Sequence, residues 1–132
     1  MAGIPYEQLP GLEHIYLEDS YLLACIERGN EIVFSLDLVL IPGHEAYTPA
    51  KPNEFHCYRY GKLIFKNPTA ITWVNKDFSH VSTDASGEID YGAIDTMTLN
   101  DGSYRLIGSW GEVLIKSDAP VVVLDPPQAS RA

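Results

Sequence analysis

The sequence predicts an all-β fold, either a single-domain antiparallel β-sandwich or a flattened barrel of about eight or nine short strands. Apolar residues alternate with a period of two along nearly every hydrophobic stretch, and turn-forming residues separate these stretches at short intervals. The 132 residues, 45% of them hydrophobic, suffice for one domain with its own core. We expect residues 1–125 to form this domain, with residues 1–10 irregular and residues 126–132 a flexible C-terminal tail.

The clearest hairpin spans residues 20–41. A two-residue Gly29-Asn30 loop sets Arg28 opposite Glu31, a favourable pair of opposite charges. In this register one face collects Tyr21, Leu23 and Cys25 opposite Leu38, Leu36 and Phe34, and the other pairs Leu22 with Asp37, Ala24 with Ser35 and Ile26 with Val33. A shift by one residue would lose this sorting, so the register is specified.

Further strands follow in the second half of the chain. An Asp101-Gly102 loop predicts a hairpin in which Leu99 faces Tyr104. A third turn is expected at Trp110-Gly111. Residues 121–124 are apolar on both faces, which predicts a final strand packed inside a sheet.

The middle of the chain contains two strands and two long connections. Strands are expected over residues 55–66, with a bulge or sharp bend at Gly61, and over residues 69–75. Three prolines in residues 41–55 exclude a central strand or a helix there. Residues 76–88 form the second connection.

Charge and composition restrict the partners. A net charge of −9 repels phosphate backbones and anionic lipid surfaces, so neither nucleic acid nor membrane is expected as a partner, whereas a basic protein is. The apolar runs are far shorter than the roughly 20 residues of a membrane-spanning helix. The first residues lack the pattern of a signal peptide, so a cytoplasmic protein is expected. Cys25 and Cys57 are then reduced thiols, although a bridge between them stays open.

No motif with a specific chemistry is present. The four histidines are scattered and no paired metal-ligand spacing occurs, so no metal and no cofactor is expected. No serine lies in a nucleophile elbow, and Cys57 with a histidine would be the remaining nucleophile dyad. Buried cysteine is usually structural. No catalytic residue is assigned, and a protein that is not an enzyme is favoured.

Two groups of side chains are candidates for binding. Aromatic residues that share one strand face combine apolar area with polar tips, although core packing explains them equally well. Carboxylates in the second long connection offer an acidic surface, and a histidine in the proline-rich loop lies near the start of the aromatic strand. The candidates are His44, His56, Tyr58, Tyr60, Trp73, Asp84, Glu88 and Asp90.

The order of four segments carries a family resemblance. Residues 16–23 (YLEDSYLL) lead into residues 32–38 (IVFSLDL), and residues 61–67 (GKLIFKN) precede residues 102–106 (GSYRL). This order resembles small, mostly uncharacterised bacterial β-proteins, including immunity proteins of polymorphic toxin systems. The likeness covers much of the chain from Leu12 to Lys116. Such families often show His-Asp before the first hairpin, where this chain has Glu18-Asp19. The resemblance implies a binding protein and no catalytic residues.

Three functions therefore stand as hypotheses. The leading one is a non-enzymatic cytoplasmic protein-binding domain that neutralises a toxin by covering its active surface, with acidic loops that steer a basic partner. The alternative is a small-molecule site, catalytic or not, in a barrel mouth or sandwich cleft lined by His56, Tyr58, Tyr60 and Trp73. A structural module that self-associates through a sheet edge is the third.

Overall fold

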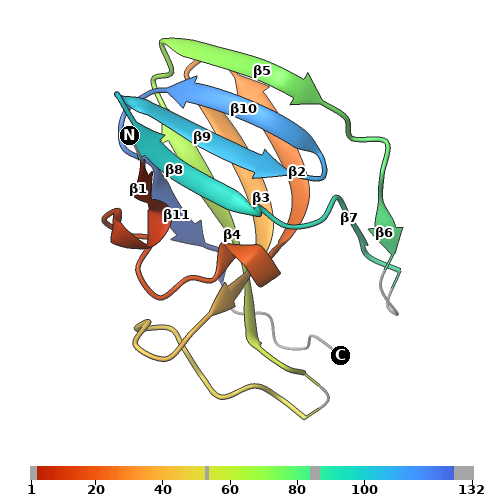
Figure 1. Cartoon of the computed structure of the whole chain (residues 1–132). Helices are drawn as coiled ribbons and strands as arrows, with labels where there is room; N and C mark the ends of the chain where they lie inside the picture. Colours follow the sequence, from red (N-terminus) through yellow and green to blue (C-terminus); the bar gives the residue numbers. More distant parts are fainter. Residues whose placement is uncertain (1–2, 53, 84–86, 127–132) are drawn as a thin grey trace.

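The computed structural model describes residues 3–52, 54–83 and 87–126. Two antiparallel sheets pack face to face, a five-stranded sheet of order β1-β8-β9-β10-β5 and a four-stranded sheet of order β11-β4-β3-β2 (Figure 1). A two-stranded sheet, β6-β7, projects beside them as an arm. The predicted all-β class is confirmed, and the architecture is a sandwich. Apart from Pro126, the predicted tail lies outside the described residues.

Eleven strands and two short 3-10 turns make up the described part of the chain. The three strands beyond the expected eight have only two residues each, too few for an alternating pattern to signal them. The elements are β1 (Ile4–Pro5), η1 (Tyr6–Gln8), η2 (Leu17–Asp19), β2 (Tyr21–Arg28), β3 (Glu31–Leu40), β4 (Cys57–Lys66), β5 (Ala70–Lys76), β6 (Ser82–Thr83), β7 (Ile89–Asp90), β8 (Thr96–Asn100), β9 (Ser103–Gly108), β10 (Gly111–Lys116) and β11 (Val121–Leu124). Among the described residues, no helix has the length and apolar character needed to cross a bilayer.

The β2–β3 hairpin has the predicted loop. Arg28 pairs with Glu31 and Cys25 with Phe34, as the sequence indicates. The β8–β9 hairpin also has the predicted register, with Leu99 opposite Tyr104. Loop chemistry and alternation therefore fix the register close to each turn.

A β-bulge at Leu23, between Leu22 and Ala24, changes the far end of the β2–β3 hairpin. Beyond it Tyr21 pairs with Asp37, so the partners predicted for residues 21–23 are wrong. One extra residue in a strand reverses which side chains face inward. Leu22 is consequently buried in the core and Tyr21 is 41% exposed, the opposite of the prediction.

Three other predictions are corrected. The turn between β9 and β10 is Ser109-Trp110, one residue earlier than expected, because Gly108 pairs with Gly111. β11 is an edge strand, not an interior one, since its sole neighbour in the sheet order is β4. Gly61 lies in an unbroken β3–β4 register instead of at a bulge. A Cβ there would lie 2.9 Å from the carbonyl oxygen of Val123, so glycine allows β11 to approach β4.

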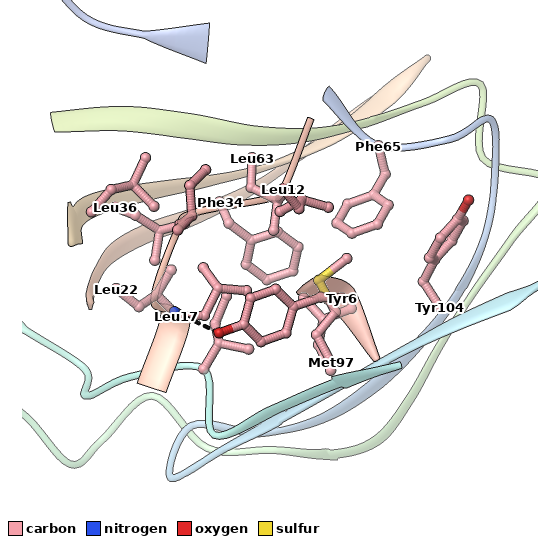
Figure 2. Close-up of a cluster of buried hydrophobic side chains, with 14 of the residues drawn as sticks. Tyr6, Leu12, Leu17, Leu22, Phe34, Leu36, Leu63, Phe65, Met97 and Tyr104 are labelled. Atoms are coloured by element: carbon pink, nitrogen blue, oxygen red, sulfur yellow. Dashed lines mark hydrogen bonds between the residues drawn. The ribbon is translucent and has the colours of Figure 1, made fainter. Parts of the chain in front are cut away.

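The N-terminal segment is ordered and closes the gap between the two sheets. β1 pairs with β8 in the five-stranded sheet, whereas Ile15 bridges to Leu40 at the end of β3 in the four-stranded sheet. Between these points Tyr6, Leu9 and Leu12 enter the core. Figure 2 shows Tyr6 among Leu17, Leu22 and Met97. Residues 3–10, the described part of the segment predicted as irregular, are thus a structural part of the sandwich.

A chain of aromatic rings fixes the base of the arm. Trp110 contacts Phe34 of the core, Trp73 of β5 and Phe78, which precedes the arm. Phe78 in turn contacts Tyr91, which follows the arm. The connection predicted over residues 76–88 therefore contains β6 and ends just before β7, and the aromatic contacts of Phe78 and Tyr91 hold both ends of the arm against the sandwich.

Candidate functional site

Four tyrosines gather on the outer face of the four-stranded sheet. Even-numbered residues of β3 point into the core, so Asp37 and Val39 point outward. Cross-strand neighbours of these two form two adjacent rows: Tyr16, Val39 and Tyr58, then Tyr21, Asp37 and Tyr60. We call these six residues the tyrosine face.

Local structure positions each tyrosine. Tyr58 and Tyr60 alternate with core-facing residues of β4, and the bulge in β2 turns Tyr21 outward. The backbone N–H of Tyr16 donates to the carbonyl of Val39 at 2.9 Å. The buried Ser20 also ties this segment to β3. Its hydroxyl donates to the carbonyl of Tyr16 and accepts the N–H of Val39.

The rings and polar groups of the tyrosine face are in contact. Tyr21 and Tyr58 stack with centroids 6.1 Å apart and an interplanar angle of 24°. The edge of His56 meets the ring of Tyr58, and its Nε2 lies 3.0 Å from an Asp19 carboxylate oxygen. Such stacked and edge-on arrangements are the favoured geometries of aromatic pairs. The face is therefore a continuous aromatic surface with a charged rim.

Carboxylates make this surface electronegative. Asp37, in the middle of the second row, is only 7% exposed. The hydroxyl of Tyr60 donates to Glu88 of the arm at 2.9 Å. Burial raises the pKa of Tyr58 from 10.0 to about 12, and Tyr21, Asp37 and Asp19 add to the rise.

The lysine nearest to this surface on the same face is already in an ion pair. Lys62 of β4 pairs with Asp125 at 2.8 Å. Arg59 leaves β4 on the opposite side and donates to the carbonyl of Asp125. Lys62 and Arg59 are therefore both engaged at Asp125.

The structure brings together half of the sequence-predicted site. His56, Tyr58, Tyr60 and Glu88 meet at the tyrosine face. His44 stays within its loop, where Nδ1 accepts the N–H of Ala46.

The remaining predicted site residues lie elsewhere or serve local structure. Asp90 accepts the N–H of Gly92 behind the arm. Trp73 belongs to the other sheet and donates to Glu27, six residues from Tyr21 along β2, roughly 20 Å away. Asp84 lies outside the described residues.

Four residues of the site were missed by reasoning from sequence. Tyr16 and Tyr21 depend on a chain crossing and a bulge that alternation does not reveal. Asp19 reaches His56 only through tertiary folding. Asp37 was assigned to the strand face opposite Leu36 and Leu38, where it does lie, but with Leu22 as its partner instead of Tyr21.

The loop beside the tyrosine face contains a small hollow and an exposed ring. The hollow is lined by Thr48, Pro49, Lys51, Glu54, Cys57 and Tyr58. Cys57 points away from His56 toward the core, and its Sγ lies 3.5 Å from the backbone nitrogen of Thr48. Phe55 is 95% exposed at the rim. Within the described ranges, no three His, Cys, Asp or Glu residues are arranged to hold a metal ion.

The raised pKa values predict loss of stability at alkaline pH. Burial raises the pKa of Cys25 from 9.0 to about 12, and that of Tyr58 from 10.0 to about 12. The folded state therefore holds protons that the unfolded state releases, and stability must fall as pH rises from about 9 to 12. Denaturant unfolding at a series of pH values should show a plateau below pH 9 and a decline above it.

A cysteine variant provides the control for this prediction. In Cys25→Ala the decline should begin near the ordinary tyrosine pKa of 10.0 instead of 9.0. If the free energy of unfolding stays constant up to pH 11 in both proteins, the raised pKa values of Cys25 and Tyr58 are contradicted.

The contacts described above are the evidence for the tyrosine face. In comparisons with protein-family models, with curated proteins and with solved structures, nothing matches this chain.

Proposed function

We propose that this chain is a cytoplasmic, non-enzymatic protein-binding domain that neutralises a basic partner by covering its surface. The observation that carries the proposal is the tyrosine face, where four tyrosines and a buried carboxylate share one outward sheet surface. Tyrosine supplies large contact area at low entropic cost and is enriched at interaction hot spots. A rigid sheet keeps these side chains preorganised for binding.

Charge supports a basic partner. The chain carries a net charge of −9, and Asp19 and Glu88 lie at the rim of the tyrosine face. Complementary charge accelerates association and excludes acidic competitors. The resemblance of residues 12–116 to immunity-protein-like families agrees with a neutralising role.

The small-molecule alternative receives less support. It requires Trp73 beside His56, Tyr58 and Tyr60, whereas Trp73 lies against Glu27 and Trp110. The tyrosine face is an open sheet surface, which suits a protein better than a small ligand that needs burial on most sides.

Capture and a growth assay test the proposal. The tagged chain is recovered from its native cells at low salt, and co-purifying proteins are identified by mass spectrometry. We expect a stoichiometric basic protein that elutes as salt rises. When the captured basic protein is expressed alone it should arrest growth, and co-expression of the chain described here should restore growth. If no basic protein co-purifies, or if the chain does not neutralise the one that does, the proposal is contradicted.

Charge variants examine the mechanism. The double variant Asp19→Asn with Glu88→Gln should slow association with the captured protein about tenfold or more. Asp95→Asn with Asp101→Asn, the same charge change on the other sheet, should have a much smaller effect. Equal effects of the two pairs would mean that net charge alone steers the partner.

A further inference from the structure

We propose that the tyrosine face recognises an arginine side chain, with the guanidinium stacked on the exposed ring of Tyr21 and paired with Asp19. This inference rests on the proposed function and names the chemistry of the partner group that the site accepts. It commits the outer sheet surface to one occupant, a protein surface that presents arginine.

The aromatic geometry provides a flat platform for this group. Tyr21 is 41% exposed, and its inner side is supported by the nearly parallel ring of Tyr58. Tyr58 is in turn supported by the edge of His56. A ring held in place from behind offers one π-face to solvent, and planar guanidinium stacks on such a face.

Charge complementarity selects a cation for this platform. Asp19 precedes Tyr21 by two residues, and its carboxylate is about half exposed beside His56. Asp37 lies directly across the strand from Tyr21, and both carboxylates act on the Tyr58 hydroxyl. Lys62, the lysine nearest along the same face, is occupied by Asp125. A cation from a partner therefore meets the half-exposed carboxylate of Asp19, and the buried Asp37 adds to the negative potential of the same surface.

The same geometry favours arginine over lysine. Guanidinium is planar, weakly hydrated and able to bind a carboxylate through two parallel N–H groups. Ammonium is a compact, strongly hydrated charge that gains less from an open aromatic face. A stacked ring, with an exposed carboxylate two residues before it in the chain, suits the planar and bidentate guanidinium of arginine.

The test compares two peptides on the full chain. An oligo-arginine peptide and an oligo-lysine peptide of equal length are titrated into the isotope-labelled protein, and NMR shifts are recorded. We expect the arginine peptide to shift signals of Tyr21, Tyr58 and Asp19, and to bind about fivefold or more tighter than the lysine peptide. Equal affinity for the two peptides, or shifts located elsewhere, would overturn the proposal.

Matched variants separate stacking from general charge. Tyr21→Phe keeps the ring and should retain arginine binding, whereas Tyr21→Leu removes the π-face and should weaken it about threefold or more. Asp19→Asn should weaken it more than Asp101→Asn, which removes the same charge from the β8–β9 turn. Thermal unfolding of each variant verifies the fold. If Tyr21→Leu binds like Tyr21→Phe, stacking is disproved.

The two proposals can fail separately. If the tyrosine face prefers arginine but no basic protein is neutralised, the recognition site stands and the neutralising function is disproved. If a basic protein is neutralised but the tyrosine face shows no preference for arginine, the proposed function stands and this inference is disproved.

Discussion

Replacement of Trp110 by alanine is expected to lower the free energy of unfolding by about 3–5 kcal/mol. Trp110 is 1% exposed and contacts Phe34, Trp73 and Phe78, so its loss opens a large cavity. Its indole N–H also donates to the carbonyl of Ala93 at 3.0 Å, and that partly buried acceptor would lose a partner. Denaturant unfolding measures the change.

The Trp110 variant should also loosen the arm. Phe78 stacks on Trp110 just before β6, so amides of β6 and β7 should exchange faster with solvent, whereas those of β3 should change less. Trp73→Ala is the matched control, because Trp73 is less buried and should cost less. A stability loss below about 1 kcal/mol for Trp110→Ala would contradict this role.

The second large effect is expected at Tyr6. Tyr6→Ala should cost about 3–5 kcal/mol, because the ring fills the closure between the sheets. Tyr6→Phe should cost about 1–3 kcal/mol, because it removes the hydroxyl that takes part in two hydrogen bonds. That hydroxyl accepts the buried N–H of Leu17 at 3.0 Å (Figure 2), and it donates to Glu18. Burial raises the pKa of Tyr6 well above its ordinary range, so the hydroxyl stays a donor.

Two variants distinguish this bond from general charge effects. Glu18→Gln keeps an acceptor for Tyr6 but removes its charge, so it should cost less than Tyr6→Phe. Glu7→Gln, on the exposed side of η1, should change stability by less than about 0.5 kcal/mol. If Tyr6→Phe is as stable as the original protein, the Leu17 bond contributes nothing.

The sequence predicted structure best where local rules act. The Gly29-Asn30 and Asp101-Gly102 loops set the correct registers near both turns, because turn chemistry and alternation agree there. The N-terminal core residues were missed for a physical reason. Tyr6, Leu9 and Leu12 recur every third position, which is not the alternation of a strand, and Pro5 and Pro10 argue against a continuous helix.

The candidate site was predictable only within one strand. Tyr58 and Tyr60 of β4 are in phase with His56 just before it, so alternation placed the three together. Trp73 has the same chemical character but reaches the opposite end of the molecule, because sheet order decides which strands are neighbours. Composition says nothing about sheet order, and so the contributions of Tyr16 and Tyr21 required the folded structure.

The pairing of β1 with β8 has a consequence for how the chain folds. Ile4 lies opposite Leu99, so the two partners are 95 positions apart in the sequence. During synthesis the first strand has no partner until most of the chain has emerged. Loop-closure entropy opposes such a distant contact, and folds dominated by distant contacts form slowly. We therefore expect the hairpin of β2 and β3 to form early, and the N-terminal segment to dock late.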